Sequence, residues 1–421
     1  MMTILTDRQT DRQTDRQTDR QTDRQTDRQT DRQKHHRVEK LDVIKAIAII
    51  FMVAGHAEAP YSHFIYLFHM AVFYIISGYL YSEKNSKNLK NLCCFICRKL
   101  KGLWFPFFIC SAIFALLNNV FLRIDIYTDK NAVLNYVASD HVVIHSIMTS
   151  RQILLAMCKC ILFSNDSELG GAFWFLRDLF IISVCYCLFS FGIRKMYTII
   201  SRNKDNDRIL AIINIAQLAI AIVLFIAGYY FSVNDIKTFG IGKVGSCYSL
   251  FYIGHLLGSS RVKNYFRRLN SKNWLWIIAV TFCCLLILNN IGSISLANNQ
   301  YGNPVFLFAC SICGWLWMYG IAHFICMEKE ARSLQAGYRI VLYIGQHTLI
   351  IVLLHFLAFK LSNFISCSYY QYPAYCIAAF PTLCGNIGAW WFLYTVIGVA
   401  VPILVYALYA RIKQFIFSTG G

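Results

Sequence analysis

A series of apolar stretches constrains the fold of this chain more than any other feature. We count about ten of them, and each is close to the roughly 20 helical residues that cross a bilayer core. They cover residues 43–57, 64–82, 102–122, 173–193, 209–231, 244–260, 274–290, 304–326, 340–361 and 386–410. With 57% hydrophobic and 15% charged residues, the chain has too little charge to cover a soluble domain of 421 residues. We therefore predict an all-α polytopic transmembrane helix bundle.

The segments between these stretches differ in charge. Alternate segments, beginning with 83–101, hold 21 Lys and Arg, whereas the other set holds six. Because cytoplasmic loops are enriched in Lys and Arg, this split predicts that both termini are cytoplasmic. It also explains most of the net charge of +18 as a topology signal. A nucleic-acid partner is therefore not expected, since no basic stripe with aromatic residues lies on a soluble domain.

The N-terminus is a tandem repeat. Residues 6–33 are seven copies of Thr-Asp-Arg-Gln, a polar sequence with nothing to bury, so we expect residues 1–37 to be a disordered tail. The membrane domain is then 38–415. Four residues correspond to twelve nucleotides, and the codons ACA-GAC-AGA-CAG are three copies of ACAG. We hypothesise that a slipping tetranucleotide tract switches expression on and off, which is phase variation.

The cysteine pattern favours no metal site. Most of the 17 cysteines fall inside apolar stretches, where Cys behaves as a small apolar residue. Cys93 and Cys97 resemble half of a metal site, but no second ligand pair follows, and we expect no metal. Cys367, Cys376 and Cys384 share a predicted outward loop and could form one disulfide.

Few ionisable side chains fall inside the predicted spans, and such residues are candidates for a functional site. They are Lys45, Arg177, Lys360 and Asp178, with Asp42 and Glu58 at the two ends of the first span. Three histidines and one aromatic segment are predicted at a common outer depth: His56, His69, His355 and residues 174–178. A lone histidine in a membrane helix often only packs against neighbouring helices, and this alternative stays open for His355.

Two segments of this sequence resemble the membrane-bound acyltransferase-3 family, which O-acetylates sugars at the cell surface. The most specific are Leu41-Asp42-x-x-Lys45 through Gly55-His56, and Phe68-His69-Met70 through Ser77-Gly78-Tyr79-Leu80. Weaker support comes from Trp174-Phe175-Leu176 and from residues 344–355. The resemblance implies about ten helices, acetyl-CoA as the acyl donor and a surface polysaccharide or lipopolysaccharide sugar as the acceptor. It also implies an essential basic residue at Lys45 and an essential histidine at His56, with His69 near the site.

The chemistry of acyl transfer suggests a role for each of these residues. A sugar hydroxyl needs a general base, and an imidazole titrates near the operating pH, so we expect His56 to be the base. Glu58 could orient it only from an unwound helix end, because positions i and i+2 share no helix face. Acetyl-CoA phosphates require cations, for which Lys45, Arg98 and Lys99 are the candidates. Acceptor binding is assigned to Trp174, Arg177, Asp178 and His355.

Two other functions stay open at this point. The chain could be a transporter or flippase for a lipid-linked saccharide, although its spans show no internal repeat of the kind common in transporters. It could also transfer another acyl group, such as succinyl. The expected partners are acetyl-CoA, a surface glycan or lipid-linked sugar, and the bilayer, and the expected location is the inner (cytoplasmic) membrane.

Overall fold

The structure is a computed structural model, which describes residues 39–137, 139–165, 167–201, 206–236, 240–327 and 335–418. The Thr-Asp-Arg-Gln repeat lies outside these residues. Helices make up nearly all of the regular structure in the described part, which contains no named strand and two isolated β-bridges. The all-α prediction is therefore confirmed for these residues.

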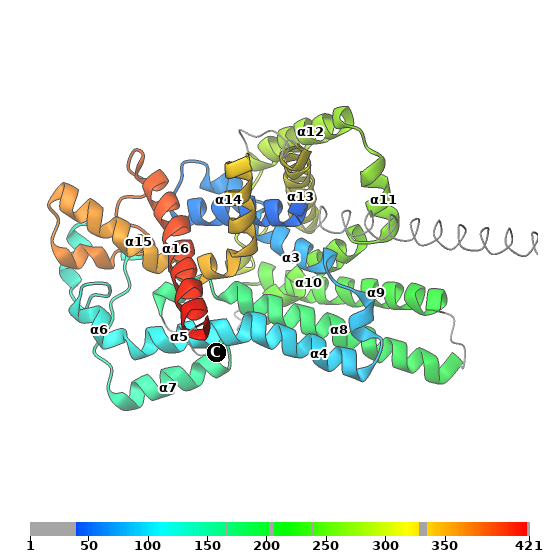
Figure 1. Cartoon of the computed structure of the whole chain (residues 1–421), viewed down its shortest axis with the longest axis horizontal. Coiled ribbons are helices and arrows are strands. Elements are labelled where there is room, and N and C mark those ends of the chain that lie inside the picture. Colours follow the sequence, from blue (N-terminus) through cyan, green and yellow to red (C-terminus); the bar gives the residue numbers. More distant parts are fainter. Residues whose placement is uncertain are drawn as a thin grey trace, which may run out of the picture.

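The first helix covers residues 39–56. The others, in chain order, are α2 (Ser62–Tyr66), α3 (His69–Tyr79), α4 (Leu89–Lys99), α5 (Phe105–Leu116), α6 (Asn118–Arg123), α7 (Ser150–Ile161), α8 (Trp174–Ser201), α9 (Asn206–Val233), α10 (Ile241–Leu257), α11 (Ser260–Arg268), α12 (Ser271–Asn289), α13 (Pro304–Met327), α14 (Gln335–Gln346), α15 (Thr348–Tyr370) and α16 (Trp390–Ser418). Figure 1 shows their arrangement, with α8, α9 and α10 side by side.

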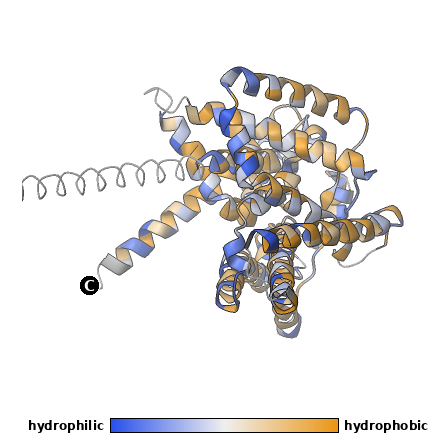
Figure 2. Ribbon diagram, turned by 90° about the vertical axis from the view of Figure 1, so that its right-hand side faces the viewer, coloured by the Kyte–Doolittle hydropathy of each residue, from blue (hydrophilic) through white to orange (hydrophobic). Residues whose placement is uncertain are grey.

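Seven helical segments are long and apolar enough to cross a membrane. They are Leu89–Leu116, Glu168–Ile200, Asp207–Val233, Ser271–Asn289, Pro304–Met327, Thr348–Tyr370 and Trp390–Phe415. Apolar residues predominate along the long helices (Figure 2), as expected for helices that cross a membrane. By the length and composition of its helices, the chain is thus a multi-pass membrane protein. The count of about ten spans stays a prediction.

The other three predicted spans coincide with helices that are buried inside the bundle. The first helix begins with four charged residues in its first two turns, α3 has 11 residues and α10 has 17. Nearly every residue of α3 is buried, and most of α10 is as well. Because their neighbours cover α3 and α10, these two helices need no long lipid-facing surface, whereas the first helix differs from the seven segments by the charged residues at its start.

Glycine allows α3 and α10 to touch backbone to backbone. A Cβ on Gly78 would lie 1.9 Å from the Phe251 carbonyl oxygen, and one on Gly254 would lie 2.0 Å from the Ile75 carbonyl oxygen. Small residues permit this close approach in membrane bundles, where helices gain stability from van der Waals packing. Gly78 of the 68–80 segment is therefore required by helix packing, and it fixes the helix that begins with His69.

The predicted span 340–361 is two helices rather than one. Chain direction changes at His347, between α14 and α15. Just before the break, a Cβ on Gly345 would lie 1.8 Å from the Asp42 carbonyl oxygen. Gln346 Nε2 donates to Asp42 Oδ2 at 3.4 Å. Residues 344–347 thus support the start of the first helix, which a single sequence cannot reveal.

The loops gather at two ends of the long helical segment Glu168–Ile200. Near its start, Glu168 Oε1 lies 2.8 Å from Lys360 Nζ. Near its end, Arg194 Nη2 lies 3.4 Å from Glu83 Oε2, and His255 Nε2 lies 3.2 Å from Glu83 Oε1. Residues 174–194 of α8 alone separate the two groups by about 30 Å at 1.5 Å per residue. We call them the Glu168 end and the Glu83 end.

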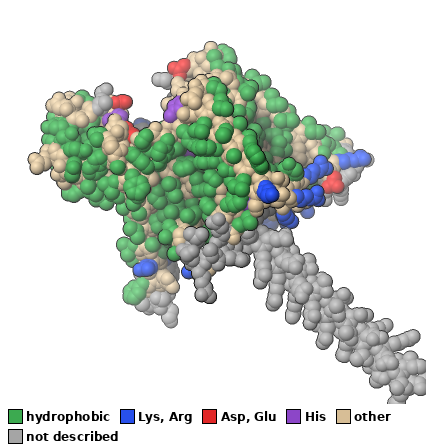
Figure 3. Space-filling view, turned by 90° about the horizontal axis from the view of Figure 1, so that it is seen from above, with side chains coloured by type: hydrophobic (Ala, Val, Ile, Leu, Met, Phe, Trp, Pro, Cys, Tyr) green, Lys and Arg blue, Asp and Glu red, His purple; other side chains and the backbone are tan. Residues whose placement is uncertain are grey.

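The two ends collect the two predicted sets of loops. The Glu83 end joins residues from two predicted Lys- and Arg-rich loops to the last turn of α10, and most Lys and Arg side chains on the face in Figure 3 lie toward the right-hand end. At the Glu168 end, Glu58 Oε1 faces His141 Nε2 at 3.3 Å. The alternation of loops is thus reproduced by the contacts, and the assignment of the Glu83 end to the cytoplasm stays a prediction.

Candidate active site

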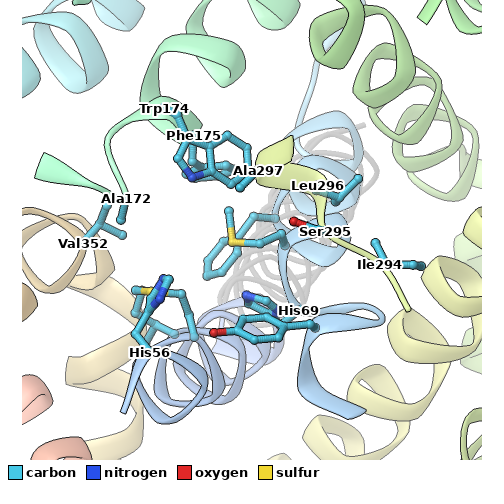
Figure 4. A pocket seen from close by; sticks show the side chains of 15 residues that line it. His56, His69, Ala172, Trp174, Phe175, Ile294, Ser295, Leu296, Ala297 and Val352 are labelled. Atoms are coloured by element: carbon cyan, nitrogen blue, oxygen red, sulfur yellow. The ribbon is translucent and has the colours of Figure 1, made fainter. Parts of the chain in front are cut away.

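One face of the first helix leads into a cavity. Lys45, Ile49, Met52 and His56 follow each other at spacings of four, three and four residues, which places them on a single helix face. Three of them line a cavity of about 300 Å³, together with Tyr66, His69, Met70, Phe73, Ala172, Trp174, Phe175, Ile294, Ser295, Leu296, Ala297 and Val352. In Figure 4, His56 and His69 lie on one side of this cavity, and Trp174 and Ala297 lie on the other.

His56 is the last residue of the first helix and is half-buried. Its ring stacks at 5.5 Å between centroids on the ring of His355, and lies 4.9 Å from the ring of Phe356. Tyr66 approaches its other side, with centroids 6.3 Å apart. Neighbouring rings therefore hold the imidazole at the wall of the cavity.

His69 is the first residue of α3 and is buried at the same cavity. Its Nδ1 lies 2.9 Å from the Ile65 carbonyl oxygen. A carbonyl only accepts hydrogen bonds, so Nδ1 carries the proton and a neutral ring keeps its lone pair on Nε2. His56 and His69, which the sequence analysis placed near one site, thus line the same cavity. In this tautomer, His69 Nε2 can accept a hydrogen bond.

His355 lies behind His56 and is absent from the cavity lining. Its Nδ1 is 2.9 Å from the Ile351 carbonyl oxygen, which assigns the proton to Nδ1. Its Nε2 is buried and has no hydrogen-bond partner among the described residues. This placement favours packing against His56 as the role of His355. No contact of His355 supports its predicted role in acceptor binding, because it lines neither the cavity of His56 nor that of Arg177.

Residues 174–178 divide between two cavities. Trp174 lines the first cavity, while Arg177 lines a second one of about 370 Å³. Arg177 Nε lies 2.9 Å from Asp178 Oδ1. Lys243 joins the two sites, because its Nζ lies 3.6 Å from Asp178 Oδ2 and 4.1 Å from the centre of the Trp174 ring.

The three predicted donor cations lie apart from the cavity lining. Lys45 Nζ pairs with Asp42 Oδ1 at 2.6 Å, one turn before Ile49 on the cavity face. Arg98 is exposed on α4, and its Nη2 donates to Asn85 Oδ1 at 2.9 Å. Lys99 Nζ lies 5.5 Å from the centre of the Phe95 ring. Lys45 thus lies on the face of the first helix that leads to His56, eleven residues before it.

Glu58 follows an unwound helix end, as its predicted role requires. It has a φ of 61°, which is uncommon for a residue other than glycine. Its carboxylate accepts a hydrogen bond from Thr382 Oγ1 at 2.6 Å and faces His141 at 3.3 Å. These contacts tie Glu58 to two outward loops, and its action on His56 stays a prediction.

The sequence analysis missed two parts of the site. Residues 294–297 line the cavity from the loop between α12 and α13, yet they contain no charged residue or histidine. Lys243 lies in a predicted loop, although it is 6% exposed in the structure. The first requires the tertiary fold, whereas the position of Lys243 at the start of an apolar stretch could have marked it.

The described part of the chain contains no group of three or more His, Cys, Asp or Glu side chains that could hold a metal ion. Cys367, Cys376 and Cys384 are buried in one small cluster and are free thiols. The disulfide that the sequence left possible among these three is not formed in the structure.

One of the comparisons with known proteins found a match. A family model described as an acyltransferase domain matches residues 38–409, which is most of the chain. No curated protein and no solved structure matches it.

Proposed function

The chain belongs to the membrane-bound acyltransferase-3 family, and on this premise we propose that it transfers an acetyl group from acetyl-CoA to a sugar hydroxyl. The acceptor would be a polysaccharide or lipopolysaccharide at the cell surface, and the location the inner membrane. The observation that supports this most is the cavity that His56 and His69 share, in which His69 offers an unprotonated Nε2. A weak nucleophile such as a hydroxyl needs a positioned base of this kind.

In the proposed reaction His56 is the general base. Its imidazole takes the hydroxyl proton while the sugar oxygen bonds to the thioester carbonyl carbon. The tetrahedral intermediate then collapses, the carbon–sulfur bond breaks, and the imidazolium returns the proton to the CoA sulfur. His69 Nε2 would accept a hydrogen bond from a neighbouring hydroxyl of the sugar and so orient the acceptor before attack, because its Nδ1 proton is engaged by Ile65.

The lining of the cavity suits a thioester. Met52, Met70, Phe73 and Phe175 provide an apolar wall, which excludes water and so disfavours hydrolysis of the donor. Thioether side chains also adapt to the irregular shape of a pantetheine arm.

Donor entry from the Glu83 end follows from the order of residues on the first helix. Lys45 precedes His56 by about 16 Å along the helix axis at 1.5 Å per residue. We propose that Lys45, with Arg98 and Lys99 on α4, attracts the CoA phosphates as point charges. The arm would then follow the face of Ile49 and Met52 to the histidines.

If the repeat of residues 6–33 is encoded by a slipping tetranucleotide tract, the length of that tract would decide whether the enzyme is expressed. The proposed role of the tract is an on/off switch for the surface modification, and the peptide would take no part in catalysis. Mixed synonymous codons without a four-base period would contradict this proposal.

The test of the proposed activity is transfer of radiolabelled acetyl groups in membrane vesicles. The acceptor is envelope glycan extracted from cells in which the gene is inactivated. We expect His56→Ala to insert normally and to lose at least 100-fold in transfer rate, since a general base contributes about 10² to 10⁴. His63→Ala is the matched control, because His63 is exposed and lies outside this cavity.

Transfer by His56→Ala within a few-fold of the wild type would contradict the role of His56 as the base. Flipping of a lipid-linked saccharide without any labelled glycan would instead favour the transporter function.

A further inference from the structure

The second cavity lies directly beside the proposed catalytic cavity. Its volume is about 370 Å³, within the range of ligand pockets. Ala297 lines both cavities, and Lys243 of the second cavity lies against the ring of Trp174 in the first. A ligand held in the second cavity would therefore extend toward His56 and His69 past Trp174 and Ala297.

The lining of the second cavity is polar, in contrast to that of the first. It combines Arg177, Asp235 and Lys243 with three amides, and the amides are Asn298, Asn299 and Gln300. Apart from Arg177 on α8 and Phe231 on α9, its residues belong to the predicted outward loops 232–243 and 291–303. Amide and charged side chains provide the hydrogen bonds that a hydroxyl-rich ligand needs.

Positive charge exceeds negative charge in the buried part of this cavity. Arg177 and Lys243 both pair with Asp178, which is fully buried. Lys243 also donates to the Ala297 carbonyl oxygen at 2.9 Å. One carboxylate thus serves two cations, and a partly buried cation without a full counter-charge is stabilised by an anionic ligand.

The guanidinium of Arg177 is available to such a ligand. Its Nε is bonded to Asp178, while its two Nη atoms have no acceptor among the described residues. Gly240, with a φ of 87°, makes room for it, because a Cβ there would lie 2.1 Å from Nη2. A planar guanidinium with two open donors binds carboxylate or phosphate in a bidentate manner.

We propose that the second cavity is the acceptor subsite and that it binds an anionic group of the glycan, a carboxylate or a phosphate, on Arg177. This inference rests on the proposed function, since it assigns the acceptor of the same reaction. The anion would anchor the glycan while a neighbouring hydroxyl reaches the two histidines. Trp174 and Ala297 would form the boundary that the acceptor passes.

The test alters charge at exposed positions of the lining, so that the Arg177–Asp178–Lys243 contacts stay intact. Asn298→Asp adds a negative charge, and we expect it to raise the KM for the glycan at least fivefold. Asp235→Asn removes a negative charge and should lower the KM for the glycan. The backbone should tolerate this change, because Asp235 has a φ of 48°, which asparagine adopts readily. Asn131→Asp is the control, because Asn131 is exposed and lies outside both cavities.

Chemical treatment of the glycan distinguishes the two sources of the anion. Loss of transfer after carboxyl reduction indicates a carboxylate, and loss after dephosphorylation indicates a phosphate. Equal transfer to untreated, reduced and dephosphorylated glycan would overturn the proposal. So would an unchanged glycan KM in both charge variants, or a change in the KM for acetyl-CoA instead.

Binding of the same glycan to purified protein in nanodiscs separates this inference from the proposed function. Asn298→Asp should weaken binding and Asp235→Asn should strengthen it, whether or not acetyl groups are transferred. Equal binding by both variants would overturn the subsite. Absence of any His56-dependent transfer, with binding that still responds to charge, would contradict only the proposed activity.

Discussion

At the scale of single residues, the contacts that hold each ring distinguish the roles of the three histidines. His69 and His355 both have Nδ1 on a backbone carbonyl of their own helical turn, yet only His69 lines the cavity. Among the described residues, the His56 ring makes ring contacts and no hydrogen bond, so its two nitrogens stay available for proton transfer. A base that gains and then returns a proton needs this freedom.

Lys45 provides a residue-scale prediction about the donor. Lys45→Gln should raise the KM for acetyl-CoA about tenfold without changing the KM for the glycan, because only the donor carries the phosphates that Lys45 would bind. Steady-state transfer in vesicles with each substrate varied measures both values.

The control addresses the ion pair of Lys45 with Asp42, since loss of one partner leaves a buried charge. Asp42→Asn combined with Lys45→Gln removes both charges and should restore normal insertion. If the double variant also regains the wild-type KM for acetyl-CoA, Lys45 has only a structural role.

At the scale of elements, largely buried helices position the two histidines. α3 begins with His69 and packs on α10 through Gly78 and Gly254, so the distance between these two helices decides where His69 lies. The seven longer segments supply the lipid-facing surface around them. The active residues therefore lie on elements that are shorter and more buried than those that define the membrane protein.

Gly254→Ala tests this contact. The added Cβ would lie 2.0 Å from the Ile75 carbonyl oxygen, so the two helices must separate. We expect a lower melting temperature in detergent and a loss of transfer activity. Gly192→Ala on α8 is the control, because no atom lies within 4 Å of its Cβ and alanine favours a helix by about 1 kcal/mol. A Gly254→Ala protein as stable as Gly192→Ala would contradict the close packing.

At the scale of the whole molecule, the bundle has a basic end and an opposite end that His56 approaches. Glu83 joins Arg194 and His255 at the first, while Glu58, two residues after His56, joins His141 at the second. Donor and acceptor would thus arrive from opposite ends and meet at one cavity. This arrangement requires that the two ends of the bundle face different compartments.

Epitope tags test the orientation of the bundle. A tag inserted after residue 270 should be cleaved by protease only in inside-out vesicles, and one inserted after residue 130 only in right-side-out vesicles. These expectations follow from the positive-inside rule. Cleavage of both tags from the same side would contradict the two-ended arrangement and the route of the donor.

The sequence by itself determined the helical class, the membrane setting and the two motif histidines, because these follow from local hydrophobicity and from residue types at fixed spacing. It could not predict that three apolar stretches are buried short helices, that α14 and α15 are separate, or that Lys243 bridges Asp178 and Trp174. These features arise from contacts between segments far apart in the chain. Only the tertiary structure decides such contacts, since they depend on packing geometry that no local pattern records.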